Sequence, residues 1–530
     1  MNKNNRWLYV FLFTLPAIFI LLTKFLDNDI WYLLAEGRYI IQNGIYHIDP
    51  LSLHKGLEVT VQNWLSAAFL WVAYDFFGEM GLIFLLLACN LAICVLLYKL
   101  CMLISDNNKI VSLITMLVCD FVLATEYIVT RPQIFSFITL IAVIYVLELY
   151  IKKGKWKYLI WLPFISLLQI NMHASLWWMI FLFAIPYVID AFKCEKLKLQ
   201  GYKKLPLFIA LIVSFGFGFL NPYGLKAITF IFNSYGNDLM HSYIMELATF
   251  NFSILFCKII FAILMAMLLI FAYFKNGHVR VRYLCLIAGT ALLGFMSIKG
   301  FNVFILVAFF PFAYFFKDMT KKEVVIKKPR VAKTLNIVYL VLAIIALGGT
   351  LVLYARDSKN IVLVNNTSGA LNVLSLYANP ETSTVYSSFN NGGAVEFYGF
   401  KAYIDPRAEV FLKVNNKKKN VFKEFYELQT GKLDINKFLE KYNFTHLLLD
   451  QSDILYYSVD GENIGKGYIL MHQDNNMGVR LLARKDQFTD EQLKMIEQQY
   501  QESLKALVEQ SQEQNSDLVN NMTNGKAKNK

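Results

Sequence analysis

The sequence has none of the glycine-rich motifs that bind nucleotides. Neither the P-loop pattern Gly-x-x-x-x-Gly-Lys-Ser/Thr nor the Gly-x-Gly-x-x-Gly fingerprint occurs in it. In proteins that carry these motifs, backbone N–H groups of the loop and of the following helix hold the phosphates. ATP-driven transport and dinucleotide chemistry therefore have no support in this chain.

Cysteine is also scarce. The chain has seven cysteines, and none follows Cys285. Their spacings match no zinc or redox motif, and the C-terminal region has no cysteine with which to form a disulfide. This absence, in a region rich in Lys and Asn, fits an outer surface that does not depend on oxidative folding, as in a Gram-positive bacterium.

Apolar residues, by contrast, dominate the composition. Hydrophobic residues make up 56% of the 530 positions and aromatic residues 15%, which predicts a polytopic α-helical membrane protein. The net charge of +12 does not predict binding to nucleic acid, because the basic residues lie largely between apolar segments. We expect these residues to face anionic membrane lipids.

About eleven apolar segments are long enough to cross a membrane as helices. They cover approximately residues 7–24, 80–104, 109–127, 133–151, 157–171, 174–192, 205–220, 252–274, 282–298, 300–316 and 334–354. The first segment lacks a small-residue cleavage site, so we expect it to be retained rather than removed as a signal peptide.

The basic residues indicate which side of the membrane each connection faces. With a cytoplasmic N-terminus, the inner connections and their flanks hold about twenty Lys and Arg, and the outer loops about six. An odd number of spans then places everything after about Leu353 outside the cell. The predicted location is a bacterial plasma membrane, with the C-terminus extracytoplasmic.

These spans divide the chain into three predicted parts. Residues 1–355 form a transmembrane domain, in which 27–79 is the first outer loop. Residues 356–488 form an extracytoplasmic α/β domain, and 489–530 form an amphipathic helix followed by a disordered tail.

Short β-rich runs alternate with helical stretches in the predicted α/β domain. The expected strands lie at 385–386, 401–404, 446–449 and 467–471, and the expected helices at 421–429 and 435–442.

The first outer loop opens with two carboxylates, Asp27 and Asp29, directly after the first apolar segment. An Asp that opens a helix is commonly an N-cap, which is the simplest interpretation of this pair. The loop also predicts two amphipathic helices, at 31–40 and from Trp64 to Phe77. Their Trp and Tyr residues are typical of the membrane interface, so we expect them to hold the two acids against the outer leaflet.

Other polar residues at span ends share the predicted outer side. They are Arg131, Asn171, His173, Asn221, Tyr223, His241 and Glu246. Each has a simpler interpretation. Arg131 could pair with a lipid headgroup, His173 could be a satisfied helix-end histidine, and residues 221–224 could be only a turn. In the outer domain, Arg407 could form a structural ion pair with the neighbouring carboxylates Asp405 and Glu409.

The order of these motifs resembles a group of bacterial integral membrane proteins related to the GT-C glycosyltransferases. The first outer loop carries Asp27-Asn28-Asp29-Ile30-Trp31, Gly37-Arg38, Asp49-Pro50-Leu51-Ser52 and Trp64-Leu65-Ser66. Further along are Arg131-Pro132-Gln133, Asn171-Met172-His173, Asn221-Pro222-Tyr223-Gly224, Gly392-Gly393 and the run from Tyr403 to Glu409. Pro406 stands where this group usually has Gly. The resemblance extends to about residue 485.

The resemblance implies an enzyme that takes a sugar from a polyprenyl-phosphate donor and passes it to a glycan, lipid or protein acceptor outside the membrane. Protein mannosyltransferases and lipid A aminoarabinose transferases share this scheme. It makes Asp27 or Asp29 the base that deprotonates the acceptor hydroxyl, while the other carboxylate orients it or helps to hold a cation.

The remaining roles follow from the same resemblance. Arg131 is the candidate ligand of the donor phosphate, because a guanidinium can bind phosphate through two hydrogen bonds. The candidate substrate-binding residues are Asn171, His173, Asn221, Tyr223 and Arg407. A divalent cation is conceivable at Asp27, Asp29 and His173, but two Asp and one His do not specify a metal, and no other cofactor is implied.

A second hypothesis is a non-catalytic lipid or cell-envelope polymer transporter, or an assembly scaffold. Transport calls for charged residues near the middle of the membrane and for helices broken by Gly or Pro. The predicted spans are largely uncharged, and their polar residues gather at one end. This pattern favours chemistry at the outer face.

The predicted topology can be tested by labelling the C-terminus. A tag after Lys530 should react with a membrane-impermeant reagent in intact cells, because an odd number of spans places it outside. A tag before Met1 is the matched control and should react only after the membrane is permeabilised. Cytoplasmic labelling of the C-terminal tag would invert the whole arrangement.

Overall fold

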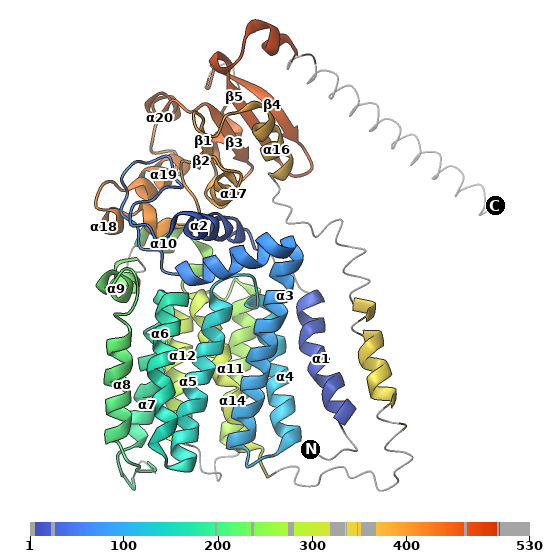
Figure 1. Cartoon of the computed structure of the whole chain (residues 1–530), viewed down its shortest axis with the longest axis vertical. Coiled ribbons are helices and arrows are strands. Elements are labelled where there is room, and N and C mark those ends of the chain that lie inside the picture. Colours follow the sequence, from blue (N-terminus) through green and yellow to red (C-terminus); the bar gives the residue numbers. More distant parts are fainter. Residues whose placement is uncertain are drawn as a thin grey trace, which may run out of the picture. The chain divides into compact units, whose positions relative to one another are not determined.

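The computed structural model describes residues 6–22, 27–196, 199–234, 238–273, 280–318, 334, 337–346, 348–350, 367–459, 464–495 and 498. The chain forms two compact units, which are described separately (Figure 1). The first, a helical unit, comprises Met1–Asp49, Gly56–Val364 and Arg407–Lys423. The second, a sheet unit, comprises Pro50–Lys55, Asn365–Pro406 and Glu424–Lys530.

The helical unit is built from apolar helices that stand side by side. They are α1 (Arg6–Leu22), α3 (Trp64–Ile104), α4 (Lys109–Glu126), α5 (Gln133–Lys153), α6 (Trp161–Met172), α7 (Met179–Asp190), α8 (Leu205–Phe217), α11 (Leu255–Tyr273), α12 (Val281–Met296), α13 (Phe301–Ala308) and α14 (Phe310–Phe315). Helix α3 packs against α4 and α5, α6 against α8, and α12 against α7 and α13. This arrangement places the ends of neighbouring helices, and their connections, close together.

Three helical stretches among the described residues are long and apolar enough to cross a membrane. They are Trp64–Ile104, Gln133–Lys153 and Ile298–Phe315. Shorter apolar helices lie at Leu12–Leu21, Ala174–Asp190, Leu205–Phe217, Leu255–Ile270, Val281–Met296 and Ile337–Thr350. The chain is thus a polytopic membrane protein, while the count of eleven spans stays a prediction.

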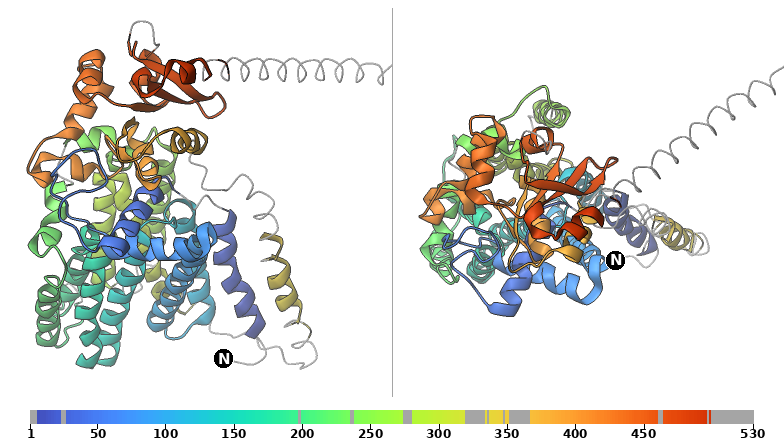
Figure 2. Two further views of the ribbon diagram at one scale, coloured as in Figure 1. Left: turned by 45° about the horizontal axis from the view of Figure 1, so that its top comes forward. Right: turned by 90° about the horizontal axis from the view of Figure 1, so that it is seen from above.

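Two helices lie across one end of this bundle. Helix α2 (Ile30–Asn43) ends at Gly44, whose φ of 85° suits a residue without a side chain. Helix α3 changes direction at Gly78, where φ is 58° and ψ is −143°, so its first part runs across the bundle and its second part along it (Figures 1 and 2). The exposed side chains of Phe76 and Phe77 fit the interfacial helix that the sequence predicts.

A dry ion cluster joins three helices at the other end of the bundle. The guanidinium of Arg282 in α12 lies 2.8 Å from Glu148 of α5 and 2.7 Å from Asp190 of α7. The hydroxyl of Tyr187 donates to Glu148 at 2.9 Å, and the three ionised side chains are at most 4% exposed. Such a cluster resists opening, because separating any pair leaves a buried charge without its partner.

The sheet unit contains one mixed sheet. Its strands are β1 (Thr384–Ser387), β2 (Lys401–Ala402), β3 (His446–Asp450), β4 (Tyr468–Asp474) and β5 (Val479–Arg484), in the order β2-β1-β3-β5-β4. Strand β1 pairs in parallel with β2 and β3, and β5 pairs antiparallel with β3 and β4. The helices are α16 (Ser368–Tyr377), α17 (Gly392–Phe397), α20 (Ile435–Tyr442) and α21 (Ile454–Ser458), and α19 (Val421–Gln429) spans the boundary between the units.

The C-terminal region therefore has the strands and helices that the sequence indicates, with differences in detail. Strand β2 is only two residues long, and β5 is a strand that the sequence did not reveal. The predicted helix over 489–512 is helical at 490–495, and most of its remainder, like the predicted disordered tail, lies outside the described residues.

The two units exchange short segments of chain. Residues 50–55, from the predicted first outer loop, belong to the sheet unit, where Ser52 bridges in parallel to Ala402 and the N–H of Leu53 donates to the Ala402 carbonyl at 2.9 Å. Residues 407–423 belong to the helical unit. The chain consequently contributes Arg407 to the helical unit.

The dry ion cluster predicts a large loss of stability when its cation is removed. Replacing Arg282 with Met leaves two buried carboxylates uncompensated, so the free energy of unfolding should fall by about 3–5 kcal/mol. Thermal unfolding in detergent measures this as a lower midpoint. Adding Glu148→Gln should recover part of the loss, because it removes one unpaired charge.

The matched control is Lys226→Met, which removes a cation whose partner, Glu58, is on the surface 2.8 Å away. This variant should unfold at the wild-type midpoint, since exposed ion pairs contribute little. Equal midpoints for Arg282→Met and wild type would contradict the stabilising role.

Candidate functional site

One guanidinium binds three carboxylates at the end of the bundle that carries α2. The Nη2 atom of Arg131, in the turn between α4 and α5, lies 2.8 Å from both carboxylate oxygens of Asp27 and 3.1 Å from Oδ2 of Asp29. Its Nη1 atom donates to both oxygens of Glu246, at 2.9 and 3.0 Å. The structure thus brings the two predicted acids and the predicted phosphate ligand into direct contact.

The backbone around the two acids turns tightly into α2. The N–H of Asp29 donates to Oδ1 of Asp27 at 3.0 Å, and the N–H of Ile30 donates to the Asp27 carbonyl at 3.0 Å. Asp29 holds the N-cap position of α2, but its side chain makes no capping hydrogen bond. The carboxylate of Asp29 is directed to Arg131 instead, so the simple N-cap interpretation does not account for it.

A second cation, Lys299, completes the cluster. Its Nζ atom lies 3.2 Å from Oε2 of Glu246, so Glu246 bridges Lys299 and Arg131. The two segments are also joined by a side chain, because the hydroxyl of Ser297 donates to the Glu246 carbonyl at 3.3 Å. Sequence reasoning placed Glu246 on the outer side without a role and missed Lys299. The available signal was a lysine between two spans on a side where basic residues are few.

Burial and neighbouring charges set the protonation of this cluster. Burial, with the charge of Asp27 beside it, raises the pKa of Asp29 from 3.8 to about 6, although Arg131 acts in the opposite direction. Burial would also raise the pKa of Glu246, but Lys299 and Arg131 outweigh it and lower this pKa to about 2. For Arg131, burial favours the neutral form, and the three carboxylates outweigh that effect and raise its pKa. Near neutral pH the guanidinium is charged, and Asp29 is a stronger base than an ordinary aspartate.

His173 lies at the end of α6 beside this cluster. Its Nδ1 atom is hydrogen-bonded to the hydroxyl of Ser136 at 3.0 Å, and Gln169 donates to both the Ser136 hydroxyl and the His173 carbonyl. Burial, and then the charge of Lys299, lower the pKa of His173 to about 3. The imidazole is therefore neutral at physiological pH and can donate or accept a hydrogen bond but carries no charge.

The other predicted substrate-binding residues of the helical unit make bonds within the protein. Asn171 accepts from the Trp64 indole at 3.0 Å and donates to two backbone carbonyls. Asn221 closes a turn by accepting from the N–H of Tyr223 at 2.8 Å, and the Tyr223 hydroxyl donates to the Tyr46 carbonyl at 3.0 Å. These contacts are those of a scaffold, and substrate binding by the three residues stays a prediction.

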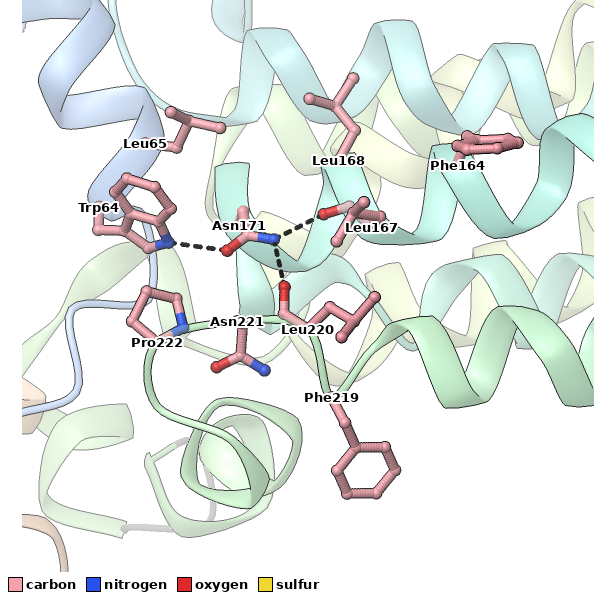
Figure 3. Close-up of a pocket in the computed structure, with 10 residues that line it drawn as sticks. All are labelled: Trp64, Leu65, Phe164, Leu167, Leu168, Asn171, Phe219, Leu220, Asn221 and Pro222. Carbon is pink, nitrogen blue, oxygen red and sulfur yellow. Dashed lines mark hydrogen bonds between the residues drawn. The ribbon is translucent and has the colours of Figure 1, made fainter.

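A groove of about 800 Å³ opens beside Asn171 (Figure 3). Its walls come from the start of α3, from α6 and from the chain after α8, and they are lined by Trp64, Leu65, Phe164, Leu167, Leu168, Asn171, Phe219, Leu220, Asn221 and Pro222. The lining is mostly apolar, with the two asparagines as its polar groups. Asp27, Asp29 and Arg131 are not among these residues, so the cluster around Arg131 does not line this groove.

Arg407 occupies a buried position in the helical unit. Its Nη1 atom lies 2.9 Å from Asp49 and 3.4 Å from Glu36, and its side chain is 2% exposed. Tyr46 also donates to Glu36, at 3.2 Å. This is a structural ion pair, as in the alternative interpretation from the sequence, and it includes two carboxylates, Asp49 and Glu36, that are distant in the chain. Its predicted contact with substrate has not been tested.

The described residues contain no preformed binding site for the possible divalent cation. Within the described residues, no three His, Cys, Asp or Glu side chains are grouped so that they could hold a metal ion. In the Arg131 cluster the carboxylates converge on a guanidinium, which takes the place that a cation would need. The Nδ1 atom of His173 is hydrogen-bonded to Ser136.

Comparisons with known proteins show likeness in fold but not in sequence. No known protein family matches the chain, and no curated protein matches it. The crystal structure of ArnT from Cupriavidus metallidurans bound to undecaprenyl phosphate matches with a TM-score of 0.53 and 9% identity, over 92% of this chain and 99% of ArnT. ArnT in the apo state matches with a TM-score of 0.50 and 11% identity, over 90% and 97% of the two chains.

The chain has the fold of ArnT. At such low identity the likeness shows the fold alone. It supports the expected GT-C-like architecture, with a multi-span helical part and a C-terminal sheet domain. The expected relation to protein mannosyltransferases stays a prediction, as do the roles of the individual site residues.

The raised pKa of Asp29 predicts a pH-dependent cost in stability. Because the folded-state pKa, about 6, exceeds the ordinary value of 3.8, the contribution of this carboxyl is fully present below pH 4 and is lost as the pH rises through about 6. The charged groups around it are Arg131, Asp27, Lys299 and Glu246. Wild type should therefore lose thermal stability relative to Asp29→Asn between pH 5 and pH 8, as measured by unfolding midpoints in detergent.

The control is Glu58→Gln. The hydrogen bond and charge of Lys226 lower the pKa of Glu58, so its titration lies below this pH range. Its midpoints should run parallel to those of wild type. If the curve for Asp29→Asn is also parallel to wild type, Asp29 is not destabilised by burial.

Proposed function

We propose that this protein is a membrane glycosyltransferase that moves a sugar from a polyprenyl-phosphate donor to an acceptor on the outer face of the membrane. The observation that carries the proposal is the cluster of two carboxylates around Arg131. It lies at the end of an apolar helix bundle with the fold of ArnT, a protein solved with undecaprenyl phosphate. A lipid-linked phosphate would present its headgroup at such a membrane edge.

The two carboxylates differ in a way that assigns them different roles in this proposal. Asp27 accepts hydrogen bonds from Arg131 and from the N–H of Asp29, which fixes its orientation. Asp29 makes a longer contact to Arg131, at 3.1 Å, and has the raised pKa. We therefore assign Asp29 as the base and Asp27 as the group that positions the turn and the guanidinium.

The reaction transfers a glycosyl group between two oxygen atoms. Asp29 takes the proton of an acceptor hydroxyl while that oxygen forms a bond to the anomeric carbon of the sugar. The bond from this carbon to the phosphate oxygen breaks, and its electron pair stays on the polyprenyl phosphate. Arg131 stabilises the negative charge that develops there, because it is held charged at the site. The neutral His173 offers a hydrogen bond to either substrate.

The site chemistry favours this function over a passive scaffold. A scaffold gains nothing from a carboxylate whose ionisation costs stability, whereas a general base needs a pKa close to the working pH. The exposed fractions of Asp27 and Asp29 are 27% and 25%, so substrates can reach both. The sugar and the acceptor are set by contacts beyond this cluster.

Replacing the acids separately tests the proposal. In membranes supplied with radiolabelled polyprenyl-phosphate sugar, Asp29→Asn should lower the rate of sugar transfer by about 10²–10⁴-fold, which is the usual contribution of a general base. The wild-type rate should also fall as the pH drops below about 6, because protonated Asp29 cannot accept the proton. Asp27→Asn should reduce the rate less and should move this pH limb to lower pH, because the charge of Asp27 contributes to the raised pKa of Asp29.

Glu58→Gln serves as the matched carboxylate control and should transfer sugar at the wild-type rate, since Glu58 forms its ion pair with Lys226 at the surface. Full turnover by both Asp27→Asn and Asp29→Asn would refute the base assignment. An absence of transfer from any polyprenyl-phosphate sugar by wild type would refute the function.

A further inference from the structure

Glu246 is the partner of Arg131 that the proposed reaction does not use. Asp27 and Asp29 bind one terminal nitrogen of the guanidinium, and Glu246 binds the other. Glu246 also bridges to Lys299, 3.2 Å from its second oxygen. The carboxylate of Glu246 thus lies between two cations. Proteins commonly bind a phosphate group between cationic side chains of this kind.

We propose that Arg131 and Lys299 together form the binding site for the donor phosphate, and that Glu246 occupies this site as an internal anion until the donor displaces it. The inference rests on the proposed function and deepens it, since it adds Lys299 as a phosphate ligand and gives Glu246 a gating role.

The charges of the cluster support this exchange. With Asp27, Asp29 and Glu246 ionised, and Arg131 and Lys299 protonated, the five side chains sum to −1. A polyprenyl-phosphate sugar is a phosphodiester, which carries a single negative charge and two free oxygens. It can replace the carboxylate of Glu246 without changing the net charge. Without that displacement, a donor anion would enter a cluster that is already negative and would be repelled.

The exposure of the three carboxylates shows which one can leave. The side chain of Glu246 is 46% exposed, against 27% for Asp27 and 25% for Asp29. When the Glu246 side chain rotates into water, it loses its ion pairs with Arg131 and Lys299. Water then solvates the carboxylate, and the phosphate takes its place beside the two cations. Its backbone can stay in place, because the Glu246 carbonyl is held by Ser297.

A positioning role for Glu246 makes the opposite prediction. If Glu246 only aimed Arg131 and Lys299 at a phosphate, its removal would disorder both cations and weaken phosphate binding. If it occupies the phosphate site, its removal vacates the site and strengthens binding. The sign of the change therefore separates the two roles.

The experiment measures the binding of radiolabelled undecaprenyl phosphate to the purified full-length protein in detergent micelles. Glu246→Gln should bind this lipid about tenfold more tightly than wild type, because the neutral amide no longer competes for the two cations. Glu246→Asp keeps the charge but is one methylene shorter, so it should give a smaller gain. Lys299→Gln should weaken binding several-fold, and Glu58→Gln, a carboxylate paired elsewhere, should bind as wild type does.

Weaker or unchanged binding by Glu246→Gln would overturn the inference. Tighter binding by Glu246→Gln together with an unchanged affinity of Glu246→Asp would also overturn it. That pattern would mean that the charge at position 246 repels the lipid from a distance and does not occupy the phosphate site. Failure of the proposed function looks different. In that case wild type and every variant bind no undecaprenyl phosphate, or Arg131→Gln binds it as tightly as wild type.

Discussion

The arrangement of the site depends on keeping one guanidinium charged at the edge of an apolar bundle. Arg131 loses most of its hydration there, and its side chain is 14% exposed. Three carboxylates from two connections compensate for that loss, so the entry into α2 and the segment before α11 are both tied to the cation in the turn before α5. Each of these connections is irregular, and the shared ion pairs give them a defined position.

Two ionic clusters of the helical unit, around Arg282 and around Arg131, differ in their access to water. Around Arg282 two carboxylates meet one guanidinium in a dry setting, and the result is a joint between helices. Around Arg131 three carboxylates compete for two cations, and every member keeps some contact with solvent. The carboxylates outnumber the cations by one in both clusters, so their access to water separates them. The dry cluster stays closed, because opening it would leave a buried charge without its partner, whereas the wetter cluster can exchange a carboxylate for an anion from outside.

Much of this could be predicted from sequence because it depends on local signals. Turn residues and apolar periodicity predicted α2, α19 and α20, and the topology placed Asp29 and Arg131 on one face. Strand β5 follows β4 after a short turn, but it escaped prediction because its sequence, from Val479 to Arg484, lacks a regular alternation of apolar and polar residues. Lys299 escaped because it occupies a single position between two spans. The partners of Arg407, more than 350 residues away in sequence, could not be inferred, since ion pairs across such distances depend on the whole fold.

The exchange of segments between the units limits how the chain can be divided. A fragment containing only residues 367–495 would lack residues 50–55, and the two-residue strand β2 would lose the neighbour that covers its edge. The same fragment would carry Arg407 without Asp49 and Glu36, so a cation that is buried in the whole protein would lose two of its carboxylate partners. The sheet unit is therefore not a module that can be transplanted by cutting the chain at a single point.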